Sequence, residues 1–200
     1  SGVKAMRATN AEVMVINGTI NKDWIRQYGE DIHNVRELYI SKDVKKIEPD
    51  MLAVLDNLTT IVVDEDNPYY DSRDNCNAVI DSQTNELIIG CQRTVIPAGI
   101  TGIGVYAFYG RSGLKSITIP YSISYISECA FEDCYNLVDV KMTSGIRHIG
   151  ARAFAGCVSL MDVWVPEEIA EVQEGAFESV NHITYDGTLE YDEWGAWIVG

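Results

Sequence analysis

The stretch AFAGCVSLMDVWVPEEIAEVQEG (residues 153–175) decides the fold, because it is one period of a repeat. Ala-Phe pairs occur at 107–108, 130–131, 153–154 and 176–177, each 23 residues after the last, and contain all four Phe of the chain. Four columns of apolar residues recur with the same 23-residue spacing. They are Ile96, Ile119, Met142, Val165; Ile100, Ile123, Ile146, Ile169; Ile103, Ile126, Ile149, Val172; and Leu114, Leu137, Leu160, Ile183. A repeat of this length predicts a solenoid, in which each coil buries its apolar positions against those of its neighbours.

Each repeat contains the pattern of a short strand that ends in a turn. Residues 114–120 (LKSITIP) alternate with period two at their end, so the isoleucines should point inward and Ser116 and Thr118 outward. Proline ends this strand at positions 97, 120 and 166, and Thr143 takes the remaining place. A second extended stretch and the Ala-Phe turn follow, where Ala lets coils approach closely and Phe fills the core.

The same frame extends back to residue 35, with Met51-Leu52 in the Ala-Phe position. Between Val63 and Ile96 lie 33 residues, which is one period plus ten. The surplus falls in 67–76 and 81–86, both rich in turn-forming residues. We therefore expect an enlarged coil at about 64–95 that contains an extra hairpin, with strands at 78–80 and 87–89.

Three parts are expected along the chain: an N-terminal cap at 1–34, the solenoid at 35–183 and a C-terminal cap at 184–200. Caps are needed because an open coil would expose its apolar ladder and its unpaired backbone. The first cap should contain a short helix from Asp23 to Tyr28, with Trp24 and Ile25 as packing residues. About six coils, roughly 4.8 Å apart, would make a stack near 30 Å long.

The columns resemble those of the BspA-like (Treponema pallidum-type) leucine-rich-repeat proteins. That family has an L-x-x-I-x-I-P strand, an I-x-x-I-G step and an A-F-x-x-C turn. Residues 117–120 and 163–166 are similar to the strand, and 149–157 to the step and turn. The resemblance also includes 67–78, similar to a long-repeat segment of such proteins from gut bacteria, and 186–188 with 194–196, similar to the terminal coil. The departures are Met51-Leu52, Thr143, Arg111 and Val180, the last two in the Cys position, and we interpret them as drift within one fold.

The resemblance implies a helix-poor, right-handed leucine-rich-repeat stack with a parallel β-sheet on one face. It also implies a secreted or surface-attached bacterial protein with a role in adhesion or host interaction, without naming a ligand. The chain begins Ser1-Gly2 and shows no basic region followed by an apolar one, so we expect no signal peptide within these residues. Its apolar runs are far shorter than the roughly 18–20 residues of a membrane span, so we expect no membrane insertion.

The formal net charge of −15 argues against nucleic acid as a partner, because phosphate binding requires clustered Lys and Arg. No Lys or Arg follows Arg152, whereas ten Asp and Glu do. We expect this acidic end to be solvated and to keep the protein soluble. The alternative is that it meets a cationic partner or divalent ions.

The five cysteines include no C-x-x-C pair of the kind that binds metals. Cys134 and Cys157 share a column, and parallel side chains on one ladder seldom meet with the dihedral that a disulfide needs, so we expect packed free thiols. Cys76 and Cys91, at the two ends of the enlarged coil, are better placed for a bridge, and both states stay open for them.

The remaining motifs do not support an enzymatic function. His148 falls between two inward isoleucines and should face solvent, out of reach of Cys157. Residues 102–107 imitate a dinucleotide fingerprint without its strand-then-helix context. The acidic run at 64–74 fails as a calcium loop, because Tyr69 stands where an EF-hand needs glycine. We therefore expect no catalytic residue, no metal and no cofactor.

The candidate site is the outward column of the strand, with aromatic and charged members: Tyr39, Val62, Val95, Thr118, Lys141 and Trp164. A structural spacer would show small polar residues there, whereas a binding protein should show aromatics and charges. We expect a non-catalytic binding or adhesion module that recognises a protein, such as a host matrix protein, or a glycan. The alternatives are a spacer or accessory domain without a ligand, in which Trp164 only packs on a neighbouring turn. The oligomeric state stays open.

Overall fold

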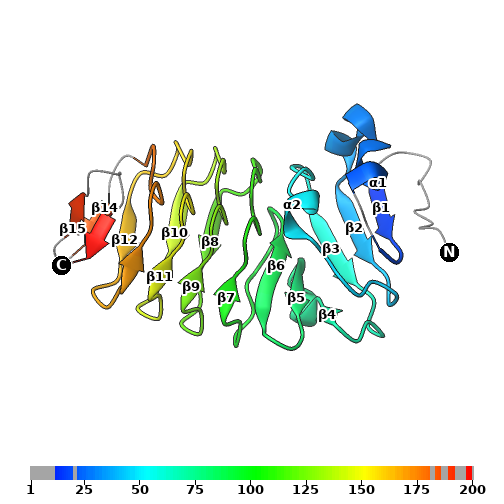
Figure 1. Cartoon of the computed structure of the whole chain (residues 1–200), viewed down its shortest axis with the longest axis horizontal. Helices are drawn as coiled ribbons and strands as arrows, with labels where there is room; N and C mark the ends of the chain where they lie inside the picture. Colours follow the sequence, from blue (N-terminus) through cyan, green and yellow to red (C-terminus); the bar gives the residue numbers. More distant parts are fainter. Residues whose placement is uncertain (1–11, 20–21, 181–182, 186–188, 192–196, 200) are drawn as a thin grey trace.

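The chain forms a β-solenoid of about seven turns, with a period of about 23 residues. The structure is a computed structural model that describes residues 12–19, 22–180, 183–185, 189–191 and 197–199. Figure 1 shows the coils stacked along the long axis, with β1 (Val13–Ile16) and β15 (Leu189–Tyr191) at opposite ends of the stack.

One side of the stack, called the strand face below, consists of short parallel strands. Its members are β1 (Val13–Ile16), β2 (Glu37–Ile40), β3 (Thr60–Val63), β8 (Ser116–Thr118), β10 (Asp139–Lys141), β12 (Val163–Val165) and β14 (Ile183–Tyr185). They pair in register as β1-β2-β3, β8-β10 and β12-β14. The predicted alternation is confirmed: Ile117 is buried on β8, and Ser116 and Thr118 are exposed.

A second sheet runs along another side of the same core, where the sequence predicts only an extended stretch. It contains β7 (Gly102–Ile103), β9 (Tyr125–Ile126), β11 (His148–Ile149) and β13 (Glu171–Val172), all parallel. The stretch becomes a sheet because its backbone groups pair between coils: the Gly150 N–H donates to the Ile126 carbonyl at 2.7 Å, and the Gln173 N–H to the Ile149 carbonyl at 2.9 Å.

The predicted hairpin of the enlarged coil is confirmed. Strands β5 (Ala78–Asp81) and β6 (Glu86–Gly90) pair antiparallel, next to β4 (Tyr70–Asp71) and the 3-10 helix η2 (Arg73–Asn75). All three strands join the second sheet, with β6 parallel to β7. The Arg73 guanidinium donates to both carboxylate oxygens of Asp71 and to the Asn85 side chain, which connects β4 to the turn of the hairpin.

The core contains the predicted Phe ladder. Phe108, Phe131, Phe154 and Phe177 are stacked with ring centroids 4.8, 5.0 and 5.6 Å apart. The first three are fully buried, and Phe177 is 3% exposed. Large aromatic rings at every coil account for much of the apolar area that this part of the core buries.

Arg111 departs from the family turn for a structural reason, so our interpretation of it as drift is wrong. Its side chain is fully buried and donates to the carbonyls of Gly90, Tyr109, Leu52 and Ala53. The last two end helix α2 (Pro49–Leu52), which belongs to the core cluster of the N-terminal coils. Arg111 itself stands on the first Ala-Phe turn of the C-terminal cluster. One side chain therefore connects the two parts of the core.

The N-terminal end is more regular than its sequence indicates. Within residues 1–34, which we expected to leave the repeat, β1 continues the parallel sheet, and Met14 and Ile16 are buried in the N-terminal core cluster. The predicted helix is present as α1 (Lys22–Arg26), followed by the 3-10 helix η1 (Gly29–Asn34), and Ile25 packs against the core. These helices replace the rest of the coil, which is why the columns are missing there.

At the C-terminal end, β15 (Leu189–Tyr191) and β16 (Trp197–Val199) form an antiparallel pair, and β16 lies beside β13. Residues 186–188 and 194–196 of the expected cap lie outside the described residues. No helix in the described part of the chain is long and apolar enough to cross a bilayer.

Candidate functional site

All six residues of the predicted outward column are exposed: Tyr39, Val62, Val95, Thr118, Lys141 and Trp164. Five lie on strands of the strand face, but Val95 does not, and its N–H donates to the Cys76 carbonyl instead. The chain is diverted there into the hairpin of the enlarged coil, and β3 and β8 are not paired. The column is therefore not the continuous strip that the sequence predicts. It divides into three parts: Tyr39 and Val62 on β2 and β3, Thr118 and Lys141 on β8 and β10, and Trp164 on β12.

Trp164 is the largest side chain of this column. Its neighbours Val163 and Val165 point inward and are fully buried, so they supply the core at this point of β12. Trp164 itself is 37% exposed. Beside it, the Thr184 hydroxyl donates to the Asp162 carboxylate at 2.8 Å. The indole thus stands on the surface, while its strand is anchored by two buried valines and by pairing with β14.

An exposed apolar cluster, called the apolar shoulder below, extends this surface toward the Ala-Phe turns. It consists of Tyr135, Val138, Val158 and Met161, whose exposed fractions lie between 49% and 67%. These are two columns on two adjacent coils, since Tyr135 and Val158, and Val138 and Met161, are each one period apart. The cluster lies outside the strand positions, so strand alternation does not predict it. In the sequence, the cluster is visible as two pairs of apolar residues that recur one period apart at positions outside the core columns.

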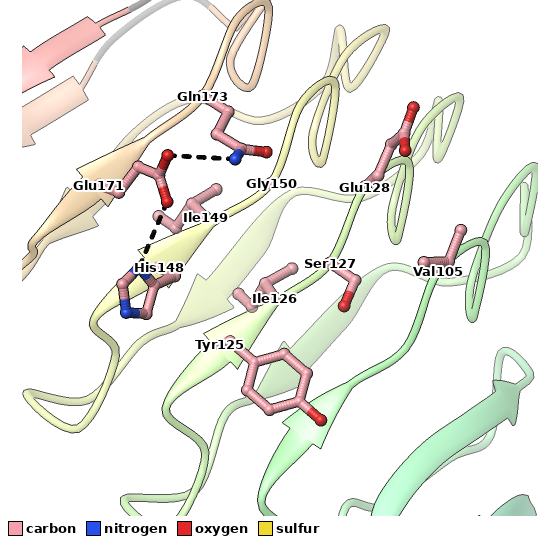
Figure 2. A pocket seen from close by; sticks show the side chains of 10 residues that line it. All are labelled: Val105, Tyr125, Ile126, Ser127, Glu128, His148, Ile149, Gly150, Glu171 and Gln173. Carbon is pink, nitrogen blue, oxygen red and sulfur yellow. Dashed lines mark hydrogen bonds and ion pairs between the residues drawn. The ribbon is translucent and has the colours of Figure 1, made fainter.

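A hollow of about 310 Å³, which the sequence does not predict, opens on the second sheet (Figure 2). Its lining comes from four neighbouring coils: Val105, Tyr125, Ile126, Ser127, Glu128, His148, Ile149, Gly150, Glu171 and Gln173. The register places Tyr125, His148 and Glu171 opposite one another on β9, β11 and β13. His148 and its partner Glu171 lie one period apart in the same column.

The polar side chains of the hollow are connected to each other. His148 Nδ1 lies 3.4 Å from Glu171 Oε2, and Gln173 Nε2 donates to Glu171 Oε1 at 3.1 Å. His148 is exposed, as predicted. These contacts fix the orientation of the Glu171 carboxylate at one edge of the hollow, as the dashed lines in Figure 2 show.

Tyr125 is held in place from the opposite edge. Its hydroxyl donates to Glu86 Oε2, and its ring covers Gly102, where a Cβ atom would lie only 2.0 Å from the ring. Burial, reinforced by the bond to Glu86, raises the pKa of Tyr125 to about 12. The ring is therefore a fixed, uncharged platform rather than a mobile side chain.

The cysteines are packing residues. All five lie in the described part of the chain, where they are free and buried, so Cys76 and Cys91 are not bridged. As predicted, Cys134 and Cys157 are packed thiols, and their Sγ atoms donate to the carbonyls of Phe108 and Phe131 at 3.1 Å. Burial raises the pKa of Cys134 above its usual range and that of Cys157 to about 12. Neither forms the thiolate that a nucleophile requires at neutral pH.

The acidic run of the enlarged coil has structural partners. Asp64 Oδ1 accepts the Asp66 N–H, and Asp71 binds Arg73 and the Ser82 hydroxyl. These bonds close turns, which accounts for the carboxylates without a calcium ion.

Parallel coils, a 23-residue period and an Ala-Phe ladder define a leucine-rich-repeat solenoid. The BspA-type leucine-rich-repeat region, in six copies, matches residues 80–190. The chain therefore belongs to the BspA-type leucine-rich-repeat proteins. A search of curated proteins finds no match.

Two solved structures share this fold over most of the chain. A leucine-rich cell surface protein from Faecalibacterium prausnitzii A2-165 is 23% identical, with a TM-score of 0.62, over 78% of this chain and 52% of that one. The pneumococcal vaccine antigen PcpA is 17% identical, with a TM-score of 0.59, over 78% of this chain and 46% of that one. The chain thus spans about half the length of these proteins. At such identities the likeness is one of fold.

Proposed function

We propose that this protein is a non-catalytic, protein-binding module of a bacterial surface protein, and that it docks its ligand on the strand face around Trp164. The observation that carries the proposal is that this outward indole and the apolar shoulder are both exposed on the same coils. Tryptophan is enriched among the residues that dominate binding energy at interfaces. Contiguous exposed apolar side chains mark interaction sites.

The apolar shoulder is a local feature and not a requirement of the repeat. The preceding coil carries Ser112 and Lys115 at the same two positions. Buried side chains on these coils, such as Leu137 and Leu160, already supply the core. Four apolar side chains left in water are costly, so a partner that covers them would gain the hydrophobic free energy of their burial.

The chemistry of this surface favours a protein over a glycan. Val138, Val158 and Met161 offer no hydrogen bonds to sugar hydroxyls, whereas aromatic residues and Met are enriched in the cores of protein interfaces. Lys141 on β10 and Asp162 beside β12 supply charges of both signs at the edge, as a polar rim does.

Surface attachment and adhesion belong to the proposal as well. Their support is the family and the Faecalibacterium structure, which is described as a cell surface protein. The competing function is a spacer that holds another domain away from the cell. A spacer would gain nothing from the exposed indole and the apolar shoulder.

The test starts with an array of host matrix proteins and glycans probed with the whole chain. For any protein that binds, Trp164→Ala should weaken the affinity about thirtyfold or more, as expected for an interface hot spot. Tyr69→Ala is the matched control, because Tyr69 is an aromatic residue of similar exposure, 38%, on the enlarged coil. It should leave binding unchanged.

Thermal melting separates binding from folding, since both variants should melt within a few degrees of the parent. If Trp164→Ala leaves binding unchanged, the strand face around Trp164 is excluded as the binding site. A chain that binds no protein on the array would support the spacer. Binding to glycans alone would contradict the protein ligand.

A further inference from the structure

We infer that the hollow on the second sheet is a separate binding site, which takes a lysine or arginine side chain from a basic segment of a partner protein. The inference does not depend on the strand face, because β9, β11 and β13 lie on another side of the core. It rests on the shape of the hollow, its charge and its fixed aromatic edge.

The shape comes from small residues at one position of successive coils. Ser127 and Gly150 follow the outward residues of β9 and β11 by two positions. At Gly150 a Cβ atom would lie 2.5 Å from the Glu128 backbone nitrogen, so the close approach of the coils requires glycine there. The resulting space of about 310 Å³ is at the lower end of the range for ligand pockets. It suits one long side chain rather than a folded loop.

The charge of the hollow is negative and is not neutralised by the protein's own Lys and Arg. Glu128 and Glu171 contribute carboxylates, and none of the ten lining residues is Lys or Arg. His148 adds a positive charge only when it is protonated. A cation placed here would therefore gain charge-assisted hydrogen bonds that a neutral ligand does not.

The two arginines that flank His148 and Gly150 in the sequence bind other groups. Arg152 binds Glu132 and Glu178, and Arg147 donates to the carbonyls of Ser144 and Ile146. No Lys or Arg follows Arg152 in the sequence, whereas ten acidic residues do. The long-range field of this part of the chain thus attracts a segment with several basic residues and steers it toward the hollow.

The aromatic edge adds a second interaction that selects cations. The Tyr125 ring is fixed by Glu86 and by its contact with Gly102. It therefore loses no conformational entropy when a ligand binds. An ammonium or guanidinium group within about 6 Å of such a ring is attracted by the π face. Figure 2 shows Tyr125 at one edge of the hollow, with Ser127 between it and Glu128.

The experiment uses the whole chain and an acetylated hexalysine peptide, titrated by calorimetry and by amide chemical shifts at about 0.15 M salt. A neutral acetylated Gly-Ser peptide of equal length and methyl glucoside serve as uncharged probes. We expect hexalysine to shift the amides of Ser127, Gly150 and Gln173, and to bind more weakly as the salt concentration rises. The uncharged probes should leave these amides unshifted.

A charge-matched pair of variants separates the hollow from the general acidity of the protein. Glu128→Gln with Glu171→Gln should weaken hexalysine binding about tenfold or more, as expected for the loss of charged hydrogen bonds. Glu65→Gln with Glu168→Gln also removes two negative charges, but from exposed turns outside the hollow. This pair should change the affinity for hexalysine less than about twofold.

Three outcomes would overturn the inference: equal loss in both double variants, amide shifts centred elsewhere, or methyl glucoside shifting these amides while hexalysine does not. Trp164→Ala should leave hexalysine binding unchanged, and the hollow variants should leave any strand-face ligand bound. Failure at one site is thereby distinguished from failure at the other.

Discussion

Replacing Arg111 by alanine tests how the two parts of the core are held together. The buried guanidinium donates to the carbonyls of Gly90, Tyr109, Ala53 and Leu52 at 2.9, 3.2, 3.2 and 3.3 Å. Alanine removes this donor from all four oxygens and leaves a void in place of the fully buried side chain. Since the bonds join residues 52–53 to residue 111, their loss weakens the contact between the N-terminal and C-terminal coils.

The size of the effect follows from two opposing costs. The Leu52 carbonyl keeps the Leu55 N–H at 3.1 Å, so at most three acceptors lose their donor. Each buried acceptor left unsatisfied costs about 1–3 kcal/mol, or roughly 3–9 kcal/mol for three. Burial lowers the pKa of Arg111 to about 10, so the native protein already bears a desolvation cost of roughly 3 kcal/mol that alanine would relieve. We expect a net loss of about 3–5 kcal/mol in the free energy of unfolding, the range for broken buried charge interactions.

Urea denaturation followed by circular dichroism and tryptophan fluorescence measures this loss. Arg152→Ala is the control, because Arg152 also binds through three nitrogens but its side chain is 46% exposed, and its loss should cost about 1 kcal/mol or less. Arg111→Met fills much of the void without restoring a donor and should remain clearly destabilised. If Arg111→Ala costs no more than Arg152→Ala, the four bonds do not connect the two parts of the core as argued.

Three further predictions concern the core and the ends. Phe131→Ala should lower the free energy of unfolding by about 3–5 kcal/mol and Phe177→Ala by less, because Phe131 stacks on two rings and Phe177 on one; equal losses in urea denaturation would argue against a ladder. Alkylation at pH 8 should leave Cys134 and Cys157 unmodified until denaturant is added, since burial raises both pKa values; mass spectrometry of labelled peptides decides this, and rapid native labelling would contradict their burial. Deletion of residues 184–200 should cause aggregation or an earlier melting transition, because the last coil loses its cover; a truncated chain that stays monomeric and melts unchanged would move the cap elsewhere.

Much of the fold is contained in the sequence, because burial in a solenoid repeats itself. Each coil presents the same positions to the core, so Ile126 and Ile149 recur one period apart and mark the inward face without any structure. The outward placement of Trp164 follows from period-two alternation with its two buried neighbours. The hairpin was also predictable, since ten surplus residues rich in turn formers must leave the coil.

The tertiary structure alone decided the features that depend on which residues meet. Backbone pairing creates the second sheet and adds β1 to the stack, and a backbone hydrogen bond requires no particular side chain. The role of Arg111 depends on carbonyls up to 59 residues away, and the hollow depends on Tyr125, His148 and Glu171 being brought into register across three coils. Periodicity reports whether a residue points inward or outward. It does not report what an outward residue touches, because that contact is set by the geometry of neighbouring coils rather than by burial in its own.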